Sequence, residues 1–354
     1  MLKLLYIFLI QSFFLISNSF ASLPLVIDTD AGWDDWIAVS YILNKIKNDD
    51  QYECVGIVVN GIGEAHLEHG INNIRKVIAL SGQGSKIPVY AGSNRPLKHD
   101  HRFPENFRKS VDNLFGIQIP NVAVDLPITD GKMFLKHLLT QNKEKVTILA
   151  IGGLTSVGEI IKENPKLSNN IERIFIMGGV LDFTSEHRSQ SPHGNIQDFQ
   201  PSDYPKNKTS EWNIFIDPVA ADIVFKNIKN ITMVPLNACR SIPLNESFLV
   251  DFKSKCKTPL GNFINKVLVY KIQEAREGNY QEYFYDPLTA AIALGYNNGV
   301  VFRKYPVYIE TKNPHALGTT YISDTKGNEI DIVVEVDPKG FKQEMIDVLC
   351  RTSF

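Results

Sequence analysis

Four aspartates stand within eight residues near the start of the chain: Asp28, Asp30, Asp34 and Asp35. They follow the apolar run Leu25–Ile27, which is typical of a buried strand, and they precede a helical pattern. Either the helix N-terminus caps one aspartate while the others point into water, or the carboxylates bind a hard cation such as Ca²⁺ or Mg²⁺. Open α/β sheets bind ligands at the carboxyl ends of their strands. Four acids at such a position therefore favour a metal site.

A second pair of polar side chains, Glu211 and Asn213, lies in the segment EWNIFIDP. In an extended strand, alternation places Glu211 and Asn213 on one face and Trp212 on the other. Two polar side chains on one face suit the two hydroxyls of a diol. The alternative is a solvated edge strand.

Two further segments carry candidates that are ambiguous when taken alone. Asp286 begins the apolar helical pattern DPLTAAIAL, where an Asp is usually a helix cap. The segment GGLTS, which contains Thr155, would alone be a glycine-rich turn before a helix. Both gain significance only together with the aspartate cluster.

The elements that must position these residues alternate along the chain, and no internal repeat or linker divides it. Apolar or alternating runs predict strands at 52–59, 146–151, 171–177, 231–236, 319–323 and 329–336. Helical spacing predicts helices that begin at residue 34 and that span 69–80, 130–140, 257–276 and 340–349, with Asp130 as a cap. The polar stretch 98–120 is predicted to be a long loop.

The N-terminus indicates an exported protein, and the composition argues against a nucleic-acid-binding one. The net charge of the 354 residues is only −2, and Lys and Arg form no stripe, so nucleic-acid binding has little support. Residues 1–21 carry an early Lys3, an apolar core and the end Ser19-Phe20-Ala21, which together are typical of a cleavable signal peptide. A transmembrane anchor is the less favoured alternative because the apolar run is short and interrupted. We expect residues 22–354 to be periplasmic or secreted, without a stable membrane anchor after cleavage.

The four cysteines are Cys54, Cys239, Cys256 and Cys350. Their spacing contains no CxxC, which argues against a zinc site. Export would permit disulfides. Burial as free thiols and pairing, for example of Cys239 with Cys256, both remain open.

The motifs together resemble those of one family. DTDAGWDD closely resembles the DTDPGxDD signature of the nucleoside hydrolases, the inosine-uridine-preferring N-ribohydrolases, with Ala31 where the family has Pro. EWNIFIDP resembles the family's E-F-N-x-x-x-D-P, GGLTS its GPLTN, and YDPLTAA its HDPLAxA. The resemblance extends from Leu25 to Leu349. It implies one catalytic domain with a Rossmann-like α/β core, a single open and mostly parallel sheet flanked by helices.

The same resemblance implies a reaction and a cofactor. The reaction is Ca²⁺-dependent hydrolysis of the N-glycosidic bond of a ribonucleoside, which gives free base and ribose. Asp30, Asp35, Asp286 and the backbone carbonyl of Thr155 would hold the Ca²⁺. Asp30 would also take a proton from the attacking water. Asp28 would orient the loop from behind.

Substrate contacts follow from the resemblance as well. Asp34, Asn195, Glu211 and Asn213 would hold the ribose, Asn195 being part of a Gly-Asn pair that the family also has. Glu64 stands where the family has an Asn that helps to bind ribose and water. A carboxylate accepts hydrogen bonds but cannot donate as an amide does. This departure concerns the range of substrates.

A second departure concerns the leaving base. Tyr285 stands where nonspecific members have a His that protonates the base. Tyr285 could stack on a purine or donate its phenolic proton, and we expect a preference for purine nucleosides. The loop over the base would come from 98–120, with His99, His101, Phe103 and Phe107 as equal candidates. The alternatives are an exported nucleoside-binding protein without turnover and a hydrolase of another ribosylated compound. The partner is a small-molecule nucleoside, and a homo-oligomer is compatible with the sequence.

Overall fold

The computed structural model describes residues 22–47, 49, 51–84, 86–119, 128–183, 193–199 and 207–351. The expected signal peptide, residues 1–21, lies outside the described residues. Within the described part of the chain, none of the helices is long and apolar enough to cross a membrane.

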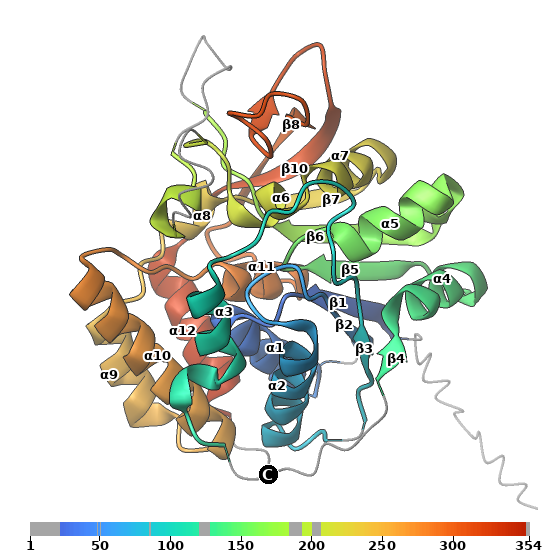
Figure 1. Cartoon of the computed structure of the whole chain (residues 1–354). Coiled ribbons are helices and arrows are strands. Elements are labelled where there is room, and N and C mark those ends of the chain that lie inside the picture. The colour runs from blue at the N-terminus through green and yellow to red at the C-terminus, as the bar shows by residue number, and fades with distance from the viewer. Residues whose placement is uncertain are drawn as a thin grey trace, which may run out of the picture.

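The described strands form one ten-stranded sheet (Figure 1). The strands are β1 Leu23–Thr29, β2 Tyr52–Val59, β3 Val89–Ala91, β4 Thr129–Asp130, β5 Val146–Ala150, β6 Ile171–Met177, β7 Ile231–Val234, β8 Val301–Ile309, β9 Thr320–Ile322 and β10 Asn328–Glu335. Their order in the sheet is β4-β3-β2-β1-β5-β6-β7-β10-β8-β9. All neighbours from β4 to β10 pair in parallel, whereas β8 and β9 pair in antiparallel fashion. The predicted open and mostly parallel sheet is confirmed.

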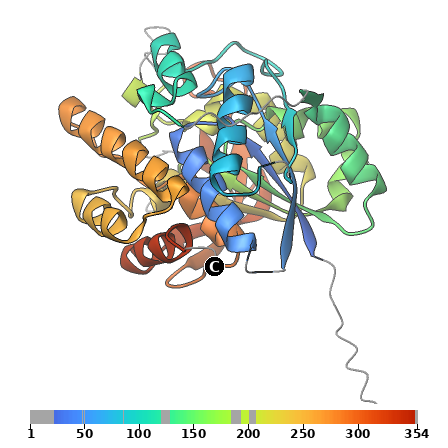
Figure 2. The same ribbon diagram turned by 90° about the horizontal axis from the view of Figure 1, so that it is seen from below.

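Helices cover both faces of this sheet (Figures 1 and 2). The α-helices are α1 Trp33–Ile46, α2 Leu67–Leu80, α3 Glu105–Asp112, α4 Gly131–Gln141, α5 Thr155–Glu163, α6 Trp212–Ile216, α7 Pro218–Asn227, α8 Leu236–Cys239, α9 Glu246–Lys255, α10 Pro259–Gly278, α11 Asp286–Ala293 and α12 Pro338–Leu349. The described residues also form the short 3-10 helices η1 Leu114–Gly116, η2 Pro165–Asn170 and η3 Ile196–Phe199. Apolar residues of α1, α2, α9, α10, α11 and α12 form one core, and those of α4, α5 and α7 form the second.

Successive side chains of β1 point alternately into these two cores. Leu25 and Ile27 point into the first core, whereas Val26 points into the second, and all three are fully buried. A strand that is buried on both faces reads as a continuous apolar run, as parallel strands do. This burial fixes the end of β1, and with it the start of the aspartate cluster, at the centre of the sheet.

Most predicted elements occur at the predicted positions, including the Asp130 cap, whose carboxylate accepts a hydrogen bond from the Met133 N–H at 3.0 Å. The stretch 98–120 was predicted to be a loop, but it contains α3 and η1. Helix α3 buries only Arg108, Val111 and Asp112, so it lacks an apolar stripe. Strand β8 and helix α9 were not predicted. The first four residues of β8 are exposed, which removes the alternation that marks a half-buried strand.

The expectation that Glu211 and Asn213 share a strand face was wrong. Glu211 is extended, but the chain then turns into the short helix α6. The Glu211 carboxylate accepts hydrogen bonds from the backbone N–H groups of Asn213 at 2.8 Å and Ile214 at 3.2 Å. It therefore caps the helix as Ser or Asp usually does.

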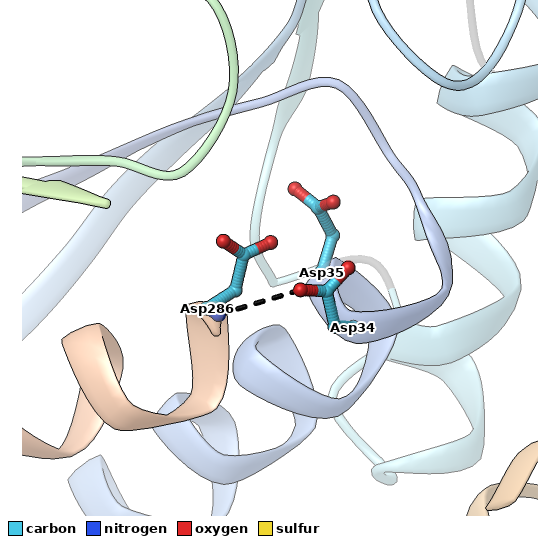
Figure 3. A group of neighbouring side chains, drawn as sticks. All are labelled: Asp34, Asp35 and Asp286. Atoms are coloured by element: carbon cyan, nitrogen blue, oxygen red, sulfur yellow. Dashed lines mark hydrogen bonds between the residues drawn. The ribbon is translucent and has the colours of Figure 1, made fainter. Parts of the chain in front are cut away.

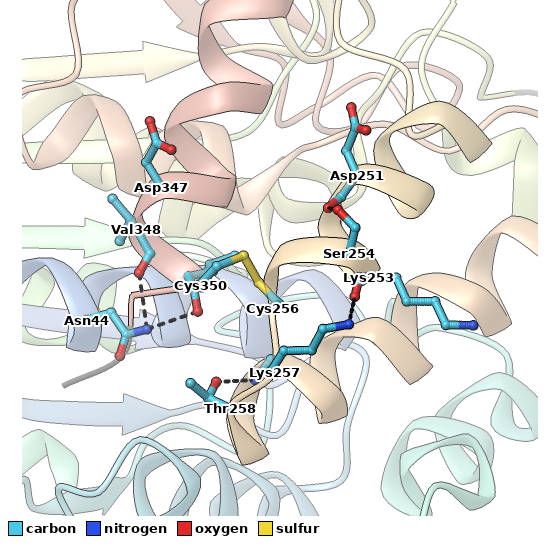
Figure 4. Close-up of a disulfide and its surroundings, with 12 residues drawn as sticks. Asn44, Asp251, Lys253, Ser254, Cys256, Lys257, Thr258, Asp347, Val348 and Cys350 are labelled. Carbon is cyan, nitrogen blue, oxygen red and sulfur yellow. Dashed lines mark hydrogen bonds between the residues drawn. A yellow bond between two sulfur atoms is a disulfide. The ribbon is translucent and has the colours of Figure 1, made fainter. Parts of the chain in front are cut away.

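One disulfide joins Cys256, which follows α9, to Cys350, which follows α12 (Figure 4). Cys54 and Cys239 are buried free thiols. The pairing of Cys239 with Cys256, offered as an example, was wrong. The bridge ties the C-terminal helix to the link between α9 and α10.

Candidate active site

Hydrogen bonds within the turn between β1 and α1 hold the aspartates in place. The Asp35 carboxylate accepts from the Thr29 hydroxyl and, at 2.9 Å, from the Gly32 N–H. Ala31 has a φ of 59°, in the left-handed region. Proline, whose ring holds φ near about −65°, could not adopt this conformation. Alanine at this position, in place of the proline of the related motif, therefore suits this turn.

Three carboxylates from two distant segments converge beside this turn (Figure 3). Asp34, Asp35 and Asp286 each offer an oxygen, and these atoms lie within 4.8 Å of one another. The Asp286 N–H donates to Asp34 Oδ2 at 3.4 Å. Asp30 lies next to the group, because its carboxyl group shares a hydrogen bond with Asp35 and accepts the Glu64 N–H at 3.1 Å. Asp34, which was expected to contact the ribose, thus belongs to the group of three converging carboxylates. Asp30, which was expected to bind the metal, lies beside that group.

Burial makes this cluster electrostatically costly. Burial, together with the charge of Asp30, raises the pKa of Asp28 and of Asp34 to about 7. Burial also raises the pKa of Asp35 and Asp286 well above the ordinary value, and the neighbouring aspartates add to the shift. A cluster of this kind is stabilised either by protons or by a cation.

The donor atoms fit a hard divalent cation. Glu64 Oε2 is buried beside the aspartates and has no hydrogen-bond partner in the part of the chain that the structure describes. The described residues that line the cavity include neither histidine nor cysteine, so its charged ligands are carboxylate oxygens. Ca²⁺ and Mg²⁺ prefer such ligands. The residues present therefore suit either of these ions better than a softer metal.

The aspartates lie in a cavity of about 430 Å³, within the range of about 300–1,000 Å³ that is usual for small-molecule sites. Nine of the predicted site residues line it: Asp30, Asp34, Asp35, Glu64, Asn195, Glu211, Asn213, Tyr285 and Asp286. The structure thus brings together residues that are far apart in the sequence: Asp34 and Asp286 are separated by 252 positions.

One wall of the cavity is polar and firmly held. Glu211 accepts the N–H groups of α6 and also the Gly179 N–H at 2.9 Å. Burial raises the pKa of Glu211 to about 7. Asn213 Nδ2 donates to the Met177 carbonyl at 3.1 Å, and Asn195 Oδ1 accepts the Trp212 N–H at 2.9 Å. These groups are fixed before a substrate arrives.

The other wall comes from the link between α10 and α11 and is rich in aromatic residues. Tyr280, Tyr283 and Tyr285 line it, and Trp33 at the start of α1 faces the same cavity. Burial, reinforced by the Glu282 carboxylate, raises the pKa of Tyr285 well above its ordinary value. Tyr285 therefore remains a neutral phenol at neutral pH.

Among the predicted metal ligands and ribose contacts, Thr155 alone lies outside the lining of the cavity, and Asp28, expected to orient the loop, does not line it either. Thr155 starts α5, and its hydroxyl donates to Asp217 Oδ2 at 2.7 Å. Ile151, directly after β5, lines the cavity instead, and its carbonyl accepts from Asn213 Nδ2 at 3.5 Å. Ile151, four residues earlier in the chain, is thus the residue of this segment that lines the cavity. Its place at the end of a parallel strand was a usable signal.

Of the candidates in 98–107, Phe103 lines the cavity and stacks on Trp212, with ring centroids 4.2 Å apart. His101 instead stacks on Phe215 at 3.9 Å. Burial lowers the pKa of His101 to about 4. Its imidazole is therefore neutral, and it packs against Phe215 of α6 and does not line the cavity. Sequence reasoning also missed Trp33, Arg240 and Glu282 as lining residues.

The chain matches a sequence profile described as inosine-uridine preferring nucleoside hydrolase over residues 25–343. A pyrimidine-specific ribonucleoside hydrolase of Shewanella woodyi is 25% identical over 336 residues, which cover 93% of this chain and 97% of that protein. Nucleoside hydrolase 3 of Arabidopsis thaliana is 25% identical over 325 residues, but these span 76% of this chain and only 35% of that longer protein.

Solved structures with the same fold include an inosine-uridine preferring nucleoside hydrolase from Bacillus anthracis, with a TM-score of 0.72, 23% identity, and coverage of 92% of this chain and 99% of that one. A purine-preferring ribonucleoside hydrolase from Gardnerella vaginalis has a TM-score of 0.75 and 21% identity, and the match covers 92% of this chain and 98% of that one.

Proposed function

The chain belongs to the inosine-uridine preferring nucleoside hydrolase family and is a ribonucleoside N-ribohydrolase, and from this premise we propose that it works with Ca²⁺ and prefers purine nucleosides. One observation carries the proposal. Asp30, which directly follows β1, and carboxylates of α1 and α11 line one cavity together with Glu211 and Asn213. A sugar in this cavity would meet both the aspartates and these polar groups.

The ion would be held by Asp35 and Asp286, with Asp30 and Asp34 beside them. The oxygen-only donor set and the unpaired Glu64 Oε2 support Ca²⁺. Bound Ca²⁺ would lower the pKa of a water molecule and fix its position.

In the reaction, the water oxygen forms a bond to C1′ of the ribose while the bond from C1′ to the base nitrogen breaks. Asp30 takes a proton from the water as general base. Burial raises the pKa of Asp30 above its ordinary value, which helps a carboxylate to accept a proton near neutral pH. The electron pair of the broken bond leaves with the base nitrogen, which takes a proton from solvent. Asp30 then releases the proton of the attacking water to solvent, and the products are ribose and free base.

The ribose is held while its ring becomes oxocarbenium-like. Glu211, Asn213 and Asn195 line the cavity, and their hydrogen bonds to the surrounding backbone hold them in place for sugar hydroxyls. Contacts that strengthen as the ring distorts lower the barrier, not only the substrate KM. We therefore assign these residues to ribose binding, together with Asp34.

Tyr285 faces the leaving base as a neutral ring. A nucleobase stacked on an aromatic face gains about 1–3 kcal/mol, and a purine offers more surface than a pyrimidine. Relatives of the chain include both pyrimidine-specific and purine-preferring enzymes, so the purine preference rests on Tyr285 alone.

Export is a further part of the proposal. The signal-peptide pattern of residues 1–21 and the disulfide between Cys256 and Cys350 support the same conclusion, because disulfides persist in oxidising compartments. We propose that the mature protein acts in the periplasm or outside the cell. Mass spectrometry of the secreted protein would test cleavage after Ala21.

A panel of nucleosides tests the whole proposal. Release of ribose from inosine, guanosine, adenosine, uridine and cytidine is measured with Ca²⁺ and with a chelator. We expect turnover with Ca²⁺ only, and higher kcat/KM for purine nucleosides. Uridine hydrolysed as fast as inosine would contradict the purine preference, and full activity in chelator would contradict the metal. Nicotinamide riboside in the same panel tests other ribosylated compounds.

A further inference from the structure

One buried carboxylate in the cavity wall has no part in the mechanism above. Glu282 lines the cavity and is 6% exposed. Its backbone is pinned to the segment before α9: the Glu282 carbonyl accepts the Leu244 N–H at 2.8 Å, and the Phe284 N–H donates to the Ile242 carbonyl at 3.2 Å. The position of Glu282 in the wall is therefore fixed by the fold.

The buried ammonium of Lys271 forms an ion pair with the Glu282 carboxylate. Lys271 of α10 is fully buried, and its Nζ lies 2.9 Å from Glu282 Oε1 and also bonds to Glu274. The ammonium lies 5.2 Å from the ring centre of Trp33 and 5.8 Å from that of Phe107. Burial alone would lower the pKa of Lys271, but the carboxylates of Glu282 and Glu274 raise it above its ordinary value. Lys271 therefore remains charged.

The Glu282 carboxylate keeps acceptor capacity toward the cavity. Oε1 is bonded to Lys271, while among the described residues Oε2 receives only the Tyr285 hydroxyl, at 3.4 Å. An ionised carboxylate offers about four acceptor positions, so roughly two remain. Both N–H and O–H groups of a ligand can donate to such a carboxylate, so the position of Glu282 decides which part of a nucleoside it meets.

The position of Glu282 points to the base and not to the sugar. Tyr285, which touches Glu282, immediately precedes Asp286 of the acidic cluster. The wall with Glu211 and Asn213 is formed by other elements, after β6 and at α6. If the glycosidic bond of a bound nucleoside lies at the acidic cluster and the ribose contacts Glu211 and Asn213, the base extends toward Tyr285 and Glu282.

We propose that Glu282, positioned by Lys271, accepts hydrogen bonds from N–H groups of the nucleobase, so that the enzyme favours nucleosides whose base carries an amino group. This inference rests on the proposed function. Ring nitrogens and carbonyl oxygens turned toward Glu282 would instead meet its negative charge, which disfavours bases that offer only acceptors there. A hydrogen bond to a charged group should change kcat/KM by about tenfold or more.

The test compares adenosine with purine riboside, which lacks only the amino group. The ratio of their kcat/KM values is measured for the wild type, Glu282→Gln and Glu274→Gln. Glu274 shares Lys271 but does not line the cavity, so it is the matched control. We expect Glu282→Gln to reduce the ratio about tenfold and Glu274→Gln to leave it unchanged. Because both substrates are compared across variants, their intrinsic difference in reactivity cancels.

A second readout does not need hydrolysis. The Kd values of free adenine and free purine are measured by quenching of tryptophan fluorescence, since Trp33 and Trp212 line the cavity. The wild type should bind adenine about tenfold more tightly than purine. Glu282→Gln should bind the two equally. An equal loss for both ligands, with a lower melting temperature, would overturn the inference in favour of a structural role. Unchanged ratios in an enzyme that releases ribose overturn this inference alone, whereas selective adenine binding without any ribose release overturns only the proposed function.

Discussion

Loss of the disulfide between Cys256 and Cys350 should lower the stability of the protein by an amount that follows from its place in the chain. The two cysteines are 94 residues apart in sequence. In the chain-entropy account, closing a loop of about this length stabilises the folded protein by about 4.7 kcal/mol. A domain of about 330 residues unfolds with an entropy of about 0.7 kcal/mol per degree, so the melting temperature should fall by about 7 °C.

The assay is thermal unfolding followed by circular dichroism, with and without a thiol reductant. The double variant Cys256→Ser/Cys350→Ser should melt at the temperature of the reduced wild type, and the reductant should not change it further. Replacing the buried free thiol of Cys54 by Ser is the matched control, since it should leave the effect of reductant intact. A thiol titration of the denatured protein should count two free thiols before reduction and four after it, as expected from the two free cysteines and the one bridge. A melting temperature that does not respond to reductant would refute the reasoning.

Three further predictions concern the site. Tyr285→Phe should keep most activity on inosine, whereas Tyr285→Ala should lose about 1–3 kcal/mol of transition-state binding, roughly 5- to 150-fold in kcat/KM; equal losses would mean that the hydroxyl is the acid. Glu211→Ala leaves the three N–H donors that it pairs with unsatisfied and should lower both kcat and the melting temperature, while Glu211→Gln keeps part of each; 2′-deoxyinosine hydrolysed as well as inosine would count against the ribose contacts. In chelator, Asp28 and Asp34, with pKa values of about 7, hold protons that the unfolded chain releases near pH 4, so stability should fall as the pH rises from about 4 to about 7. Saturating Ca²⁺ should remove most of that decline in melts at pH 5 and pH 8, and a chelated protein that melts higher at pH 8 would contradict the assignment.

The central part of the fold could be predicted because the parallel strands are buried on both faces. Such strands appear as uninterrupted apolar runs, as in Val146–Ala150. Helix α6 could not be predicted, since a helix of five residues is too short for a periodicity to show. Its cap by Glu211 imitates the alternation of a strand. The cysteine pairing also had no local signal, because it depends on how α9 and α12 pack.

The carboxylates of the site were readable because four acids after a strand are costly without a partner. The residue type of Ile151 gave no such signal, because a main-chain carbonyl places no demand on the side chain at its own position, and only the place of Ile151 directly after a strand pointed to it. Lys271 and Glu282 were missed for a different reason. A single Lys in a helix and a single Glu in a polar link normally lie in water, and only the three-dimensional packing of α10 against α1 buries them.

The most direct test of the central claim is the release of ribose from inosine as Ca²⁺ is added back to chelated enzyme. Asp35 hydrogen bonds with Asp30 and Asp286 within the acidic cluster, so Asp35→Asn should remove the cation site, while the exposed Asp251→Asn is the matched control. We expect the wild type and Asp251→Asn to regain full turnover with Ca²⁺, and Asp35→Asn to remain folded but nearly inactive. Ribose release at the wild-type rate by Asp35→Asn, or by the wild type in chelator, would contradict the central claim.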